Sequence, residues 1–337
     1  MKTHIVSPNQ EWLERAKEHI LQGGVVAFHT ETVYGLGANA FNDEAVKSIF
    51  ALKGRPADNP LIAHVHRDYD ISKIVDEVPA YTEKLRKAFL PGPLTMVYPS
   101  KGKVSRYVSC GLDTLAIRVP SSLAAQAFLR EVDLPIAAPS ANRSKHVSPV
   151  TAQHVYDDFE GKIPLILDGG ACDGGIESTV LDCTGEIPVI LRAGLVTREM
   201  IKSVVGACGV YEKKAGERPK SPGMAYKHYA PKCKTAYFTA EEIGQAIVCY
   251  REEEEKGGRP YFFLESGFAK ELTKKGFRVF DLGETGEQMA QRLYAALRQA
   301  ETQATLLIAI EPSVRGGVMD GVMNRLTRAF GRTNDET

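Results

Sequence analysis

The sequence has no net charge, because its 42 lysine and arginine residues match 42 aspartate and glutamate residues over 337 positions. Nonspecific binding to nucleic acid needs many uncompensated cations, so this balance argues against it while allowing a local basic pocket. Long apolar runs are also missing, since none approaches the roughly 20 residues that span a bilayer. Residues 1–9 lack the pattern of a signal peptide. We therefore expect a soluble, cytoplasmic protein with no membrane partner.

Paired cysteines are missing as well. The six cysteines are scattered and form no C-x-x-C pair, so the sequence indicates neither a zinc site nor a disulfide framework. We expect free thiols, as in a reducing cytosol, and no metal ligands among them.

The common phosphate-binding loops are the third absence. No G-x-x-x-x-G-K-[ST] motif occurs, and residues 35–40 fit only the G-x-G-x-x-A variant of the dinucleotide fingerprint. In that fingerprint the helix begins within the glycine turn, whereas here the first helix-start signal is Asn42-Asp43. We therefore interpret residues 30–36 as a polar turn and do not expect a dinucleotide site.

The residues that are present divide the chain into two patterns. Through residue 205, short apolar strands and amphipathic helices follow one another irregularly, which predicts an α/β domain with a twisted mixed sheet and flanking helices. Residues 206–234 carry several glycines and prolines and few apolar residues, which predicts a linker. Residues 235–337 alternate regularly between strand and helix, which predicts a small three-layer parallel α/β domain. The expected domains are therefore 10–205 and 235–337.

Dense polar clusters occur where the first domain's strands are expected to end. They span residues 30–35, 53–61, 114–120, 139–142 with 148–149, 168–170 with 177–179, and 191–194. Each cluster alone is also explained by turns and helix caps. Arg118 and Arg192 are harder to explain in this way, because each lies in or beside an apolar strand where an unpaired guanidinium is costly to bury. Each needs an anionic partner, either a structural carboxylate or a bound anion.

Together these clusters supply cations and hydroxyls suited to an anionic ligand. Arginine binds planar anions through two hydrogen bonds, and lysine acts as a point charge. A triphosphate and a carboxylate could both be held by such a set without a phosphate-binding loop. The cations are Lys53, Arg55, Arg118 and Arg192, and the hydroxyls belong to Thr32, Thr114, Ser140, Ser148 and Ser178.

Eight stretches in this order resemble the YrdC-like family of L-threonylcarbamoyladenylate synthases, and they cover nearly all of residues 10–205. Residues 221–231 resemble the linker of the two-domain version, and the C-terminal α/β part fits that version too. The resemblance therefore implies a YrdC-like twisted mixed sheet plus a small C-terminal domain. The eight stretches are 30–36, 53–61, 91–95, 116–120, 135–142, 167–170, 177–180 and 191–194.

The resemblance also implies a reaction. L-threonine, bicarbonate and ATP yield threonylcarbamoyl-AMP, pyrophosphate and water, with Mg²⁺ accompanying ATP. A separate transferase then places the threonylcarbamoyl group on adenosine 37 of tRNA, so direct contact with tRNA is allowed but not required. Two other functions stay open: an RNA-binding module, and a carbamoyltransferase that uses carbamoyl phosphate. The C-terminal domain, which has no catalytic cluster of its own, could be a separate ligand-binding or scaffold module.

The family's site residues carry over by position. Asp168 and Glu177 are expected to pair with an arginine or to hold Mg²⁺, and His64 could instead be a core histidine. Residues 221–231, including Tyr226, are expected to act as a lid. The resemblance implies Lys53 and Arg55 as catalytic; Thr32, His64, Arg118, Ala138 and Ser178 as threonine-binding; and Arg55, Asn59, Thr114, Ser140, Asn142, Ser148, Arg192 and Tyr226 as ATP-binding.

Overall fold

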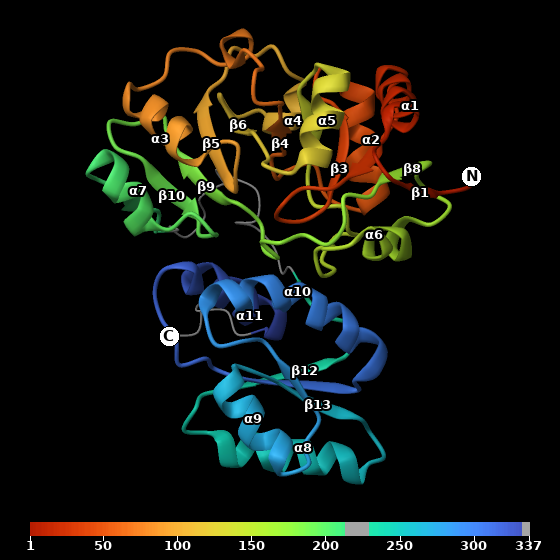
Figure 1. The fold of residues 1–337 in the computed structure, drawn as a ribbon, viewed down its shortest axis with the longest axis vertical. Coiled ribbons are helices and arrows are strands. Elements are labelled where there is room, and N and C mark those ends of the chain that lie inside the picture. Colours follow the sequence, from red (N-terminus) through yellow and green to blue (C-terminus); the bar gives the residue numbers. More distant parts are fainter. Residues whose placement is uncertain (213–228, 332–337) are drawn as a thin grey trace. The chain divides into compact units, whose positions relative to one another are not determined.

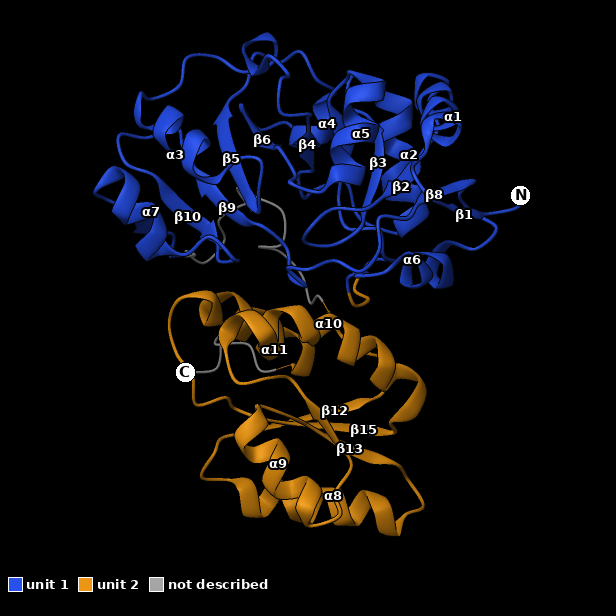
Figure 2. Cartoon of the chain, viewed as in Figure 1, with its two compact units in different colours: residues 1–144, 148–226 blue, residues 145–147, 227–337 orange. Residues whose placement is uncertain are grey.

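The computed structural model describes residues 1–212 and 229–331. Its contacts divide the chain into two units, shown in blue and orange in Figure 2. Unit 1 comprises residues 1–144 and 148–226, and unit 2 comprises residues 145–147 and 227–337. A short loop from the first half of the sequence therefore groups with the C-terminal part.

The described residues of unit 1 form one eleven-stranded mixed sheet, with strand order β1-β8-β2-β3-β7-β4-β6-β5-β9-β10-β11. Both parallel and antiparallel pairs occur, as the irregular order of predicted elements indicated. The strands are β1 (His4–Val6), β2 (Val26–Phe28), β3 (Gly35–Asn39), β4 (Ile62–His64), β5 (Leu94–Pro99), β6 (Thr114–Arg118), β7 (Ile136–Ala138), β8 (Leu165–Leu167), β9 (Thr179–Asp182), β10 (Val189–Arg192) and β11 (Gly209–Val210).

Except for α3, the α-helices of unit 1 begin after a residue whose side chain accepts a hydrogen bond from an amide of the first turn. Asn42 accepts hydrogen bonds from the amides of Glu44 and Ala45, which confirms the predicted helix start, and Gly54 ends that helix in the left-handed region. The helices are α1 (Gln10–Leu21), α2 (Asp43–Lys53), α3 (Tyr81–Phe89), α4 (Arg106–Ser109), α5 (Leu123–Val132), α6 (Ala152–Phe159) and α7 (Arg198–Val205), with a 3₁₀ turn at Ile71–Lys73.

The prediction that residues 30–36 form only a polar turn was wrong at its C-terminal end. Residues from Gly35 onward form the buried central strand β3. Glycine is needed there because a Cβ on Gly37 would lie 2.6 Å from Ile136 and 2.8 Å from Phe28. The glycines therefore allow neighbouring side chains to pack closely over the strand. In the sequence, the same glycines had indicated a turn.

A core of apolar side chains joins α1 and α5 to the sheet. It includes Ile20 of α1, Phe128 of α5, and Phe28 and Ile136 of the strands. Helices α1 and α5 also contact each other (Figure 1). This packing holds β2, β7 and β8, and so fixes the loops that leave these strands.

Unit 2 has a four-stranded parallel sheet with order β12-β15-β13-β14, which confirms the predicted parallel α/β arrangement. Strand β12 begins at Lys234, the last residue of the segment predicted to be linker. The sequence did not reveal this strand, because its half-buried residues give only a weak apolar signal. Helices α8 and α9 share an apolar core with the sheet. The elements are β12 (Lys234–Phe238), α8 (Ile243–Glu255), β13 (Pro260–Leu264), α9 (Ser266–Lys274), β14 (Val279–Asp281), α10 (Gly286–Gln303), β15 (Leu306–Ile310) and α11 (Val318–Phe330).

Across residues 1–212 and 229–331, no helix has both the length and the apolar character needed to cross a membrane.

Candidate active site

The strand registers of unit 1 place several predicted site residues in one row across the sheet. His64 pairs with Arg118, and Arg118 pairs with Thr95 on its other side. Paired residues on neighbouring strands point to the same face. Ile136 and Val180 extend this line on either side, and we call it the first row.

Other predicted residues gather at the opposite end of the same strands. Thr114 lies four residues before Arg118 on β6. Ser140 lies four residues after Ile136 and follows the end of β7, which runs antiparallel to β4. Four residues of strand span about 13 Å. The sheet therefore has two polar ends, the second carrying Thr114 and Ser140.

Between these two ends the sheet carries an apolar floor. Its central members are Ile62, Val97 and Ala116, which are buried and lie next to one another in register. Val180 and Leu191 complete this cluster, and Tyr211 packs against it. An apolar surface flanked by two polar ends suits a ligand with charged groups at both ends and a less polar middle.

Arg118 has a structural carboxylate as its partner. Its guanidinium donates to Glu31 Oε1 at 2.7 Å, and the two side chains are 4% and 13% exposed. The second oxygen, Glu31 Oε2, accepts from the Ser121 amide at 3.0 Å. Because both carboxylate oxygens are engaged, Glu31 fixes the orientation of Arg118 on the sheet.

The hydroxyl of Thr32 is oriented by its neighbour Thr30. The Thr30 hydroxyl donates its single hydrogen to the carbonyl of Val33 at 2.6 Å, since a carbonyl can only accept. The contact of 3.0 Å between the Thr30 and Thr32 hydroxyls must therefore use the hydrogen of Thr32. Thr32 is left with lone pairs only, so toward a ligand it acts as an acceptor for an ammonium or hydroxyl group.

Ser178 joins the first row through a hydrogen bond to Thr95, whose hydroxyl lies 2.8 Å from its own. The Arg192 guanidinium donates to the carbonyl of Ser178 at 2.9 Å and to its hydroxyl at 3.2 Å. The structure thus brings Arg192, expected on the nucleotide side, next to a residue expected on the threonine side.

His64 is buried in the first row and lies edge-on to the ring of Phe28, with 5.7 Å between ring centroids. Its Nδ1 is 3.1 Å from the carbonyl of Ile62, so this nitrogen carries the hydrogen and donates it. Burial, together with the positive charge of Arg118, lowers the pKa of His64 to about 3. The ring is therefore neutral at physiological pH, and its environment fits both the core and the ligand-binding interpretations.

Lys53 and Arg55 shape the loops at the second polar end. The Lys53 ammonium donates to the carbonyls of Ser140 and Asn142 and so ties the loop after β7 to the end of α2. The Arg55 guanidinium donates to the carbonyl of Asn59 at 2.7 Å and to that of the following proline at 3.2 Å. Ser140 and Asn142 are also linked directly through their side chains.

Glu177 and Asp168 each accept a hydrogen bond from a hydroxyl group. Glu177 accepts from the Ser148 hydroxyl at 2.7 Å, and both residues are buried. Asp168 accepts from the Tyr34 hydroxyl at 2.8 Å and from the Gly170 amide. For Asp168 the expected pairing with an arginine is therefore replaced by a tyrosine and a turn amide.

The cysteines and the possible metal ligands are dispersed in the part of the chain that the structure describes. All six cysteines are free, and burial raises the pKa of the Cys172 thiol, so this thiol stays protonated at neutral pH. In residues 1–212 and 229–331, no group of three histidine, cysteine or carboxylate side chains is placed to hold a metal ion. The predicted lid, residues 221–231 with Tyr226, lies mostly outside the described residues.

Three contributing residues went unassigned in the sequence: Thr30, Glu31 and Thr95. Thr30 and Glu31 lie inside a cluster that the sequence singled out, and Thr95 lies in a stretch that carries the resemblance. The need of Arg118 for an anion was the available signal for Glu31, but 87 positions separate the two residues. Only the fold could identify that partner.

Comparisons with known proteins match nearly the whole length of the chain. A family model described as "Telomere recombination" matches residues 18–194, and one described as "Threonylcarbamoyl-AMP synthase, C-terminal domain" matches residues 196–331. The threonylcarbamoyl-AMP synthase of Pyrococcus abyssi is 41% identical over 332 residues, which is 96% of this chain and 95% of the relative. That of Bacillus subtilis is 41% identical over 337 residues, which is 98% and 96%.

A solved structure agrees with these sequence matches. The crystal structure of P. abyssi Sua5 complexed with L-threonine superposes with a TM-score of 0.88 at 39% identity and covers 98% of each chain. Both domains of the family are thus present in their usual order, as the eight stretches indicated. The chain belongs to the threonylcarbamoyl-AMP synthase family.

Proposed function

We propose that unit 1 makes threonylcarbamoyl-AMP from L-threonine, bicarbonate and ATP, with release of pyrophosphate, on the sheet face described above. The observation that carries this assignment is the pair of polar ends about 13 Å apart with an apolar floor between them. The synthase activity of the family requires an amino acid and a nucleotide to meet, and such a face offers each of them one end.

The first row is the threonine end. Arg118 supplies a cation for the substrate carboxylate, and Glu31 holds that cation in place. Thr32 accepts a hydrogen bond from the substrate, because its own hydrogen is used by Thr30. The threonine-binding set is Thr32, His64, Arg118, Ala138 and Ser178.

The second polar end, with its loops, is the nucleotide end. Lys53 fixes the loop that carries Ser140 and Asn142, and Arg55 fixes the turn that carries Asn59. These contacts preorganise hydroxyl, amide and cationic groups for phosphates, which lowers the cost of ordering them on binding. We assign Lys53 and Arg55 to catalysis, and Arg55, Asn59, Thr114, Ser140, Asn142, Ser148, Arg192 and Tyr226 to ATP.

The chemistry needs positioning and neutralisation of charge rather than a covalent intermediate. The threonine amine attacks the carbon of bicarbonate, and loss of water gives an N-carboxylate. An oxygen of that carboxylate then attacks the α-phosphorus, the bond to the bridging oxygen breaks, and pyrophosphate leaves. Fixed cations and dipoles stabilise the charge that develops during such displacements. Residues with these properties are present, and no nucleophile is required.

Mg²⁺ is proposed to arrive with ATP. This ion usually keeps several waters and binds through substrate phosphates rather than a full protein cage. Bound in this way, the ion would neutralise phosphate charge, while Lys53, Arg55 and the hydroxyls hold the nucleotide.

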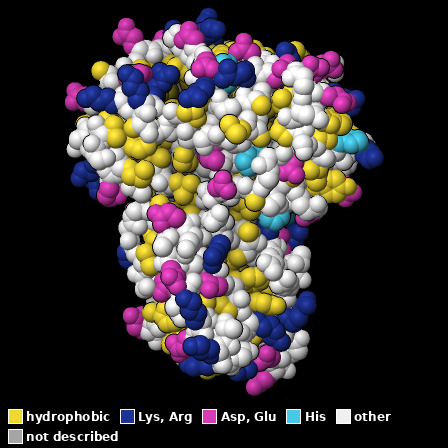
Figure 3. All heavy atoms as spheres, viewed as in Figure 1, with side chains coloured by type: hydrophobic (Ala, Val, Ile, Leu, Met, Phe, Trp, Pro, Cys, Tyr) yellow, Lys and Arg dark blue, Asp and Glu magenta, His cyan; other side chains and the backbone are white. Residues whose placement is uncertain are grey.

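The product supplies the threonylcarbamoyl group for adenosine 37 of tRNA, and we propose that a separate cytoplasmic transferase consumes it. The alternatives of an RNA-binding module and of a carbamoyltransferase are not favoured, because the relatives across the full chain are synthases. The face shown in Figure 3 agrees, since acidic and basic side chains are intermixed on it.

A pyrophosphate-release assay tests the proposal. We expect release only when L-threonine, bicarbonate and ATP are all present, and loss of at least tenfold in Arg55→Ala and Arg118→Ala. Release from ATP without threonine, or full activity in both variants, would overturn the assignment of the site. Turnover of threonine with carbamoyl phosphate in place of both bicarbonate and ATP, with release of phosphate, would instead favour the carbamoyltransferase.

A further inference from the structure

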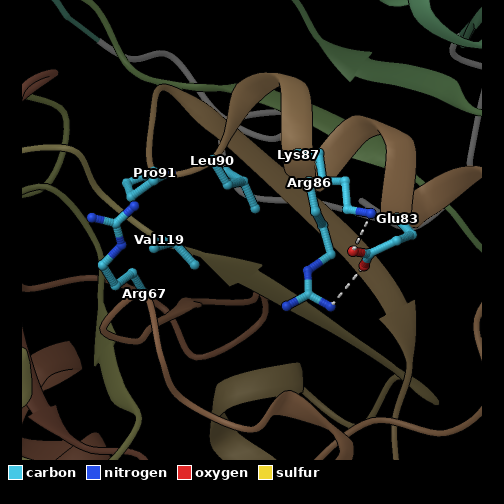
Figure 4. A pocket seen from close by; sticks show the side chains of 7 residues that line it. All are labelled: Arg67, Glu83, Arg86, Lys87, Leu90, Pro91 and Val119. Carbon is cyan, nitrogen blue, oxygen red and sulfur yellow. Dashed lines mark ion pairs between the residues drawn. The ribbon is translucent and has the colours of Figure 1, made fainter.

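Unit 1 carries a basic cavity lined by residues other than those assigned above; one of them, Val119, directly follows Arg118. This cavity of about 200 Å³ is lined by the end of α3 and by the segments that follow β4 and β6. Figure 4 shows Arg67, Pro91 and Val119 on one side and the side chains of α3 on the other. None of its lining residues belongs to the proposed active site.

The lining has an excess of positive charge. Arg67, Arg86 and Lys87 supply three cations, against the single carboxylate of Glu83. Glu83 lies 3.5 Å from Arg86 and 3.7 Å from Lys87, which is longer than a hydrogen bond. Both cations therefore keep donor hydrogens available. Among the described residues, the Arg67 guanidinium has no ion-pair or hydrogen-bond partner.

The remaining lining is apolar. Leu90, Pro91 and Val119 form it, and Val119 is buried. An apolar wall lowers the local dielectric and strengthens the attraction between the cations and an anion held against it. Arg67 and Lys87 are exposed, and Arg86 is half-buried.

The size of the cavity limits the ligand. Pockets for drug-sized molecules occupy roughly 300–1,000 Å³, so a cavity of about 200 Å³ is too small to enclose a whole nucleotide. It has room for one or two phosphoryl groups. Two guanidinium groups and an ammonium match this chemistry, because arginine binds phosphate oxygens in pairs and lysine adds a point charge.

We propose that this cavity is a second anion site, which binds a phosphoryl group through Arg67, Arg86 and Lys87. Two sources share the chemistry: free pyrophosphate, or one phosphodiester of an RNA strand that passes over the cavity. The inference does not depend on the proposed function, because none of the three cations takes part in it.

Calorimetry on the full chain tests the first source. L-threonine and α,β-methylene-ATP, which resists cleavage at the α-phosphorus, are added at saturation to fill the active site, and inorganic pyrophosphate is then titrated. We expect binding that the double variant Arg67→Gln/Lys87→Gln weakens at least tenfold. Lys84→Gln is the matched control, since Lys84 is exposed on the same helix but does not line the cavity. It should change the affinity less than twofold.

Fluorescence anisotropy with a short RNA duplex tests the second source. If RNA supplies the phosphoryl group, the double variant weakens RNA binding, and the slope of log affinity against log salt falls by about 1–2. Binding in the pyrophosphate arm alone identifies a free anion, and binding in the RNA arm alone identifies a phosphodiester. The proposal is overturned if neither arm shows binding that the double variant weakens relative to Lys84→Gln.

Synthesis of threonylcarbamoyl-AMP is measured in parallel at saturating substrate. The double variant is expected to keep its activity, because the cations are exposed or half-buried and lie outside the site. If Arg118→Ala loses synthesis but still binds the anion, the cavity assignment stands independently of the active site. If the double variant loses anion binding but keeps synthesis, the active-site assignment stands independently of the cavity.

Discussion

In unit 1 charged side chains are buried along the sheet and its loops, whereas in the described residues of unit 2 the buried polar side chains are Ser266, Arg298 and Arg325. Unit 1 buries Arg118, Arg192 and Glu177 in or beside strands, and Lys53 at the end of α2. Burying charged groups costs free energy even when they are paired, because the desolvation penalty can exceed the Coulombic gain. The buried charged groups of unit 1 therefore lower its stability and are available to bind ligands. This agrees with the assignment of the active site to unit 1.

Unit 2 is instead built mainly on apolar and aromatic packing. Tyr250 stacks on Phe262 with 5.0 Å between ring centroids, and Phe277 meets both rings edge-on. Ion pairs such as that of Arg278 with Glu254 lie on its surface. We therefore expect a large effect when a buried ion pair of unit 1 is broken and a small one when an exposed pair of unit 2 is broken.

The largest expected effect is that of Arg118→Ala. Removing one partner of a buried ion pair typically costs about 3–5 kcal/mol, because the other charge stays buried without compensation. Glu31 would be that charge. Urea unfolding followed by the fluorescence of Trp12, the single tryptophan, reports on unit 1. Arg118→Lys keeps the charge but not the planar guanidinium, so it should lose less stability than Arg118→Ala. Equal stability of wild type and Arg118→Ala would contradict the comparison.

A smaller loss is expected from Thr30→Val. This substitution preserves shape but removes the group that takes the hydrogen of Thr32, so Thr32 is no longer held as an acceptor. Losing the hydrogen bond that the substrate donates to Thr32 costs about 1–1.5 kcal/mol, which corresponds to a roughly tenfold decrease in kcat/KM for threonine. Thr30→Ser keeps the hydroxyl and should restore most of it. If the valine and serine variants have the same KM for threonine, the orientation argument is wrong.

The pH dependence of stability should also separate the units. His64 has its pKa lowered to about 3 in the folded chain, against about 6.5 when unfolded. Between these values the unfolded chain binds a proton that the folded chain does not, so stability falls as the pH decreases through 6.5. From pH 7.5 to 5.5 this group alone accounts for about 1.4 kcal/mol.

The matching measurement is urea unfolding at the two pH values. In His64→Gln the decrease, followed by Trp12 fluorescence, should be smaller than in the wild type by about that amount. Residues 229–331 contain no histidine, so the protection factors of their amides, which are corrected for the pH dependence of intrinsic exchange, should change little over the same range. An unchanged pH dependence in His64→Gln would show that His64 titrates normally in the fold.

The two units also differ in how far the sequence revealed them. Regular alternation predicted the parallel sheet of unit 2, apart from β12, whose half-buried residues carry little pattern. In unit 1, helix α2 begins where Asn42-Asp43 predicted, but β3 was missed because glycines that allow close packing look like turn residues. Periodicity detects an element from the side chains on one of its faces. It does not detect a strand such as β3, in which Gly35 and Gly37 leave one face almost without side chains.

Contacts within the site were less predictable than the residues that make them. The sequence indicated that Arg118 needs an anion, yet Glu31 lies 87 positions away, and Thr95 lies 83 positions from Ser178. Such pairs depend on the order of strands in the sheet, which short-range pattern does not specify. The direction of the Thr30–Thr32 hydrogen bond likewise follows from the position of the Val33 carbonyl.

The smallest effect is expected from Arg278→Ala in unit 2, the counterpart of Arg118→Ala. Arg278 lies 3.2 Å from Glu254, and the two side chains are 42% and 35% exposed. Exposed pairs usually contribute about 0.2–1 kcal/mol, because water screens the charges and solvates either partner alone. The backbone amide of Arg278, which donates to Tyr250, is kept in the variant. Hydrogen exchange in residues 229–331 should therefore hardly change, and pyrophosphate release should match the wild type. A loss as large as that of Arg118→Ala would show that burial does not decide the cost of breaking an ion pair in this chain.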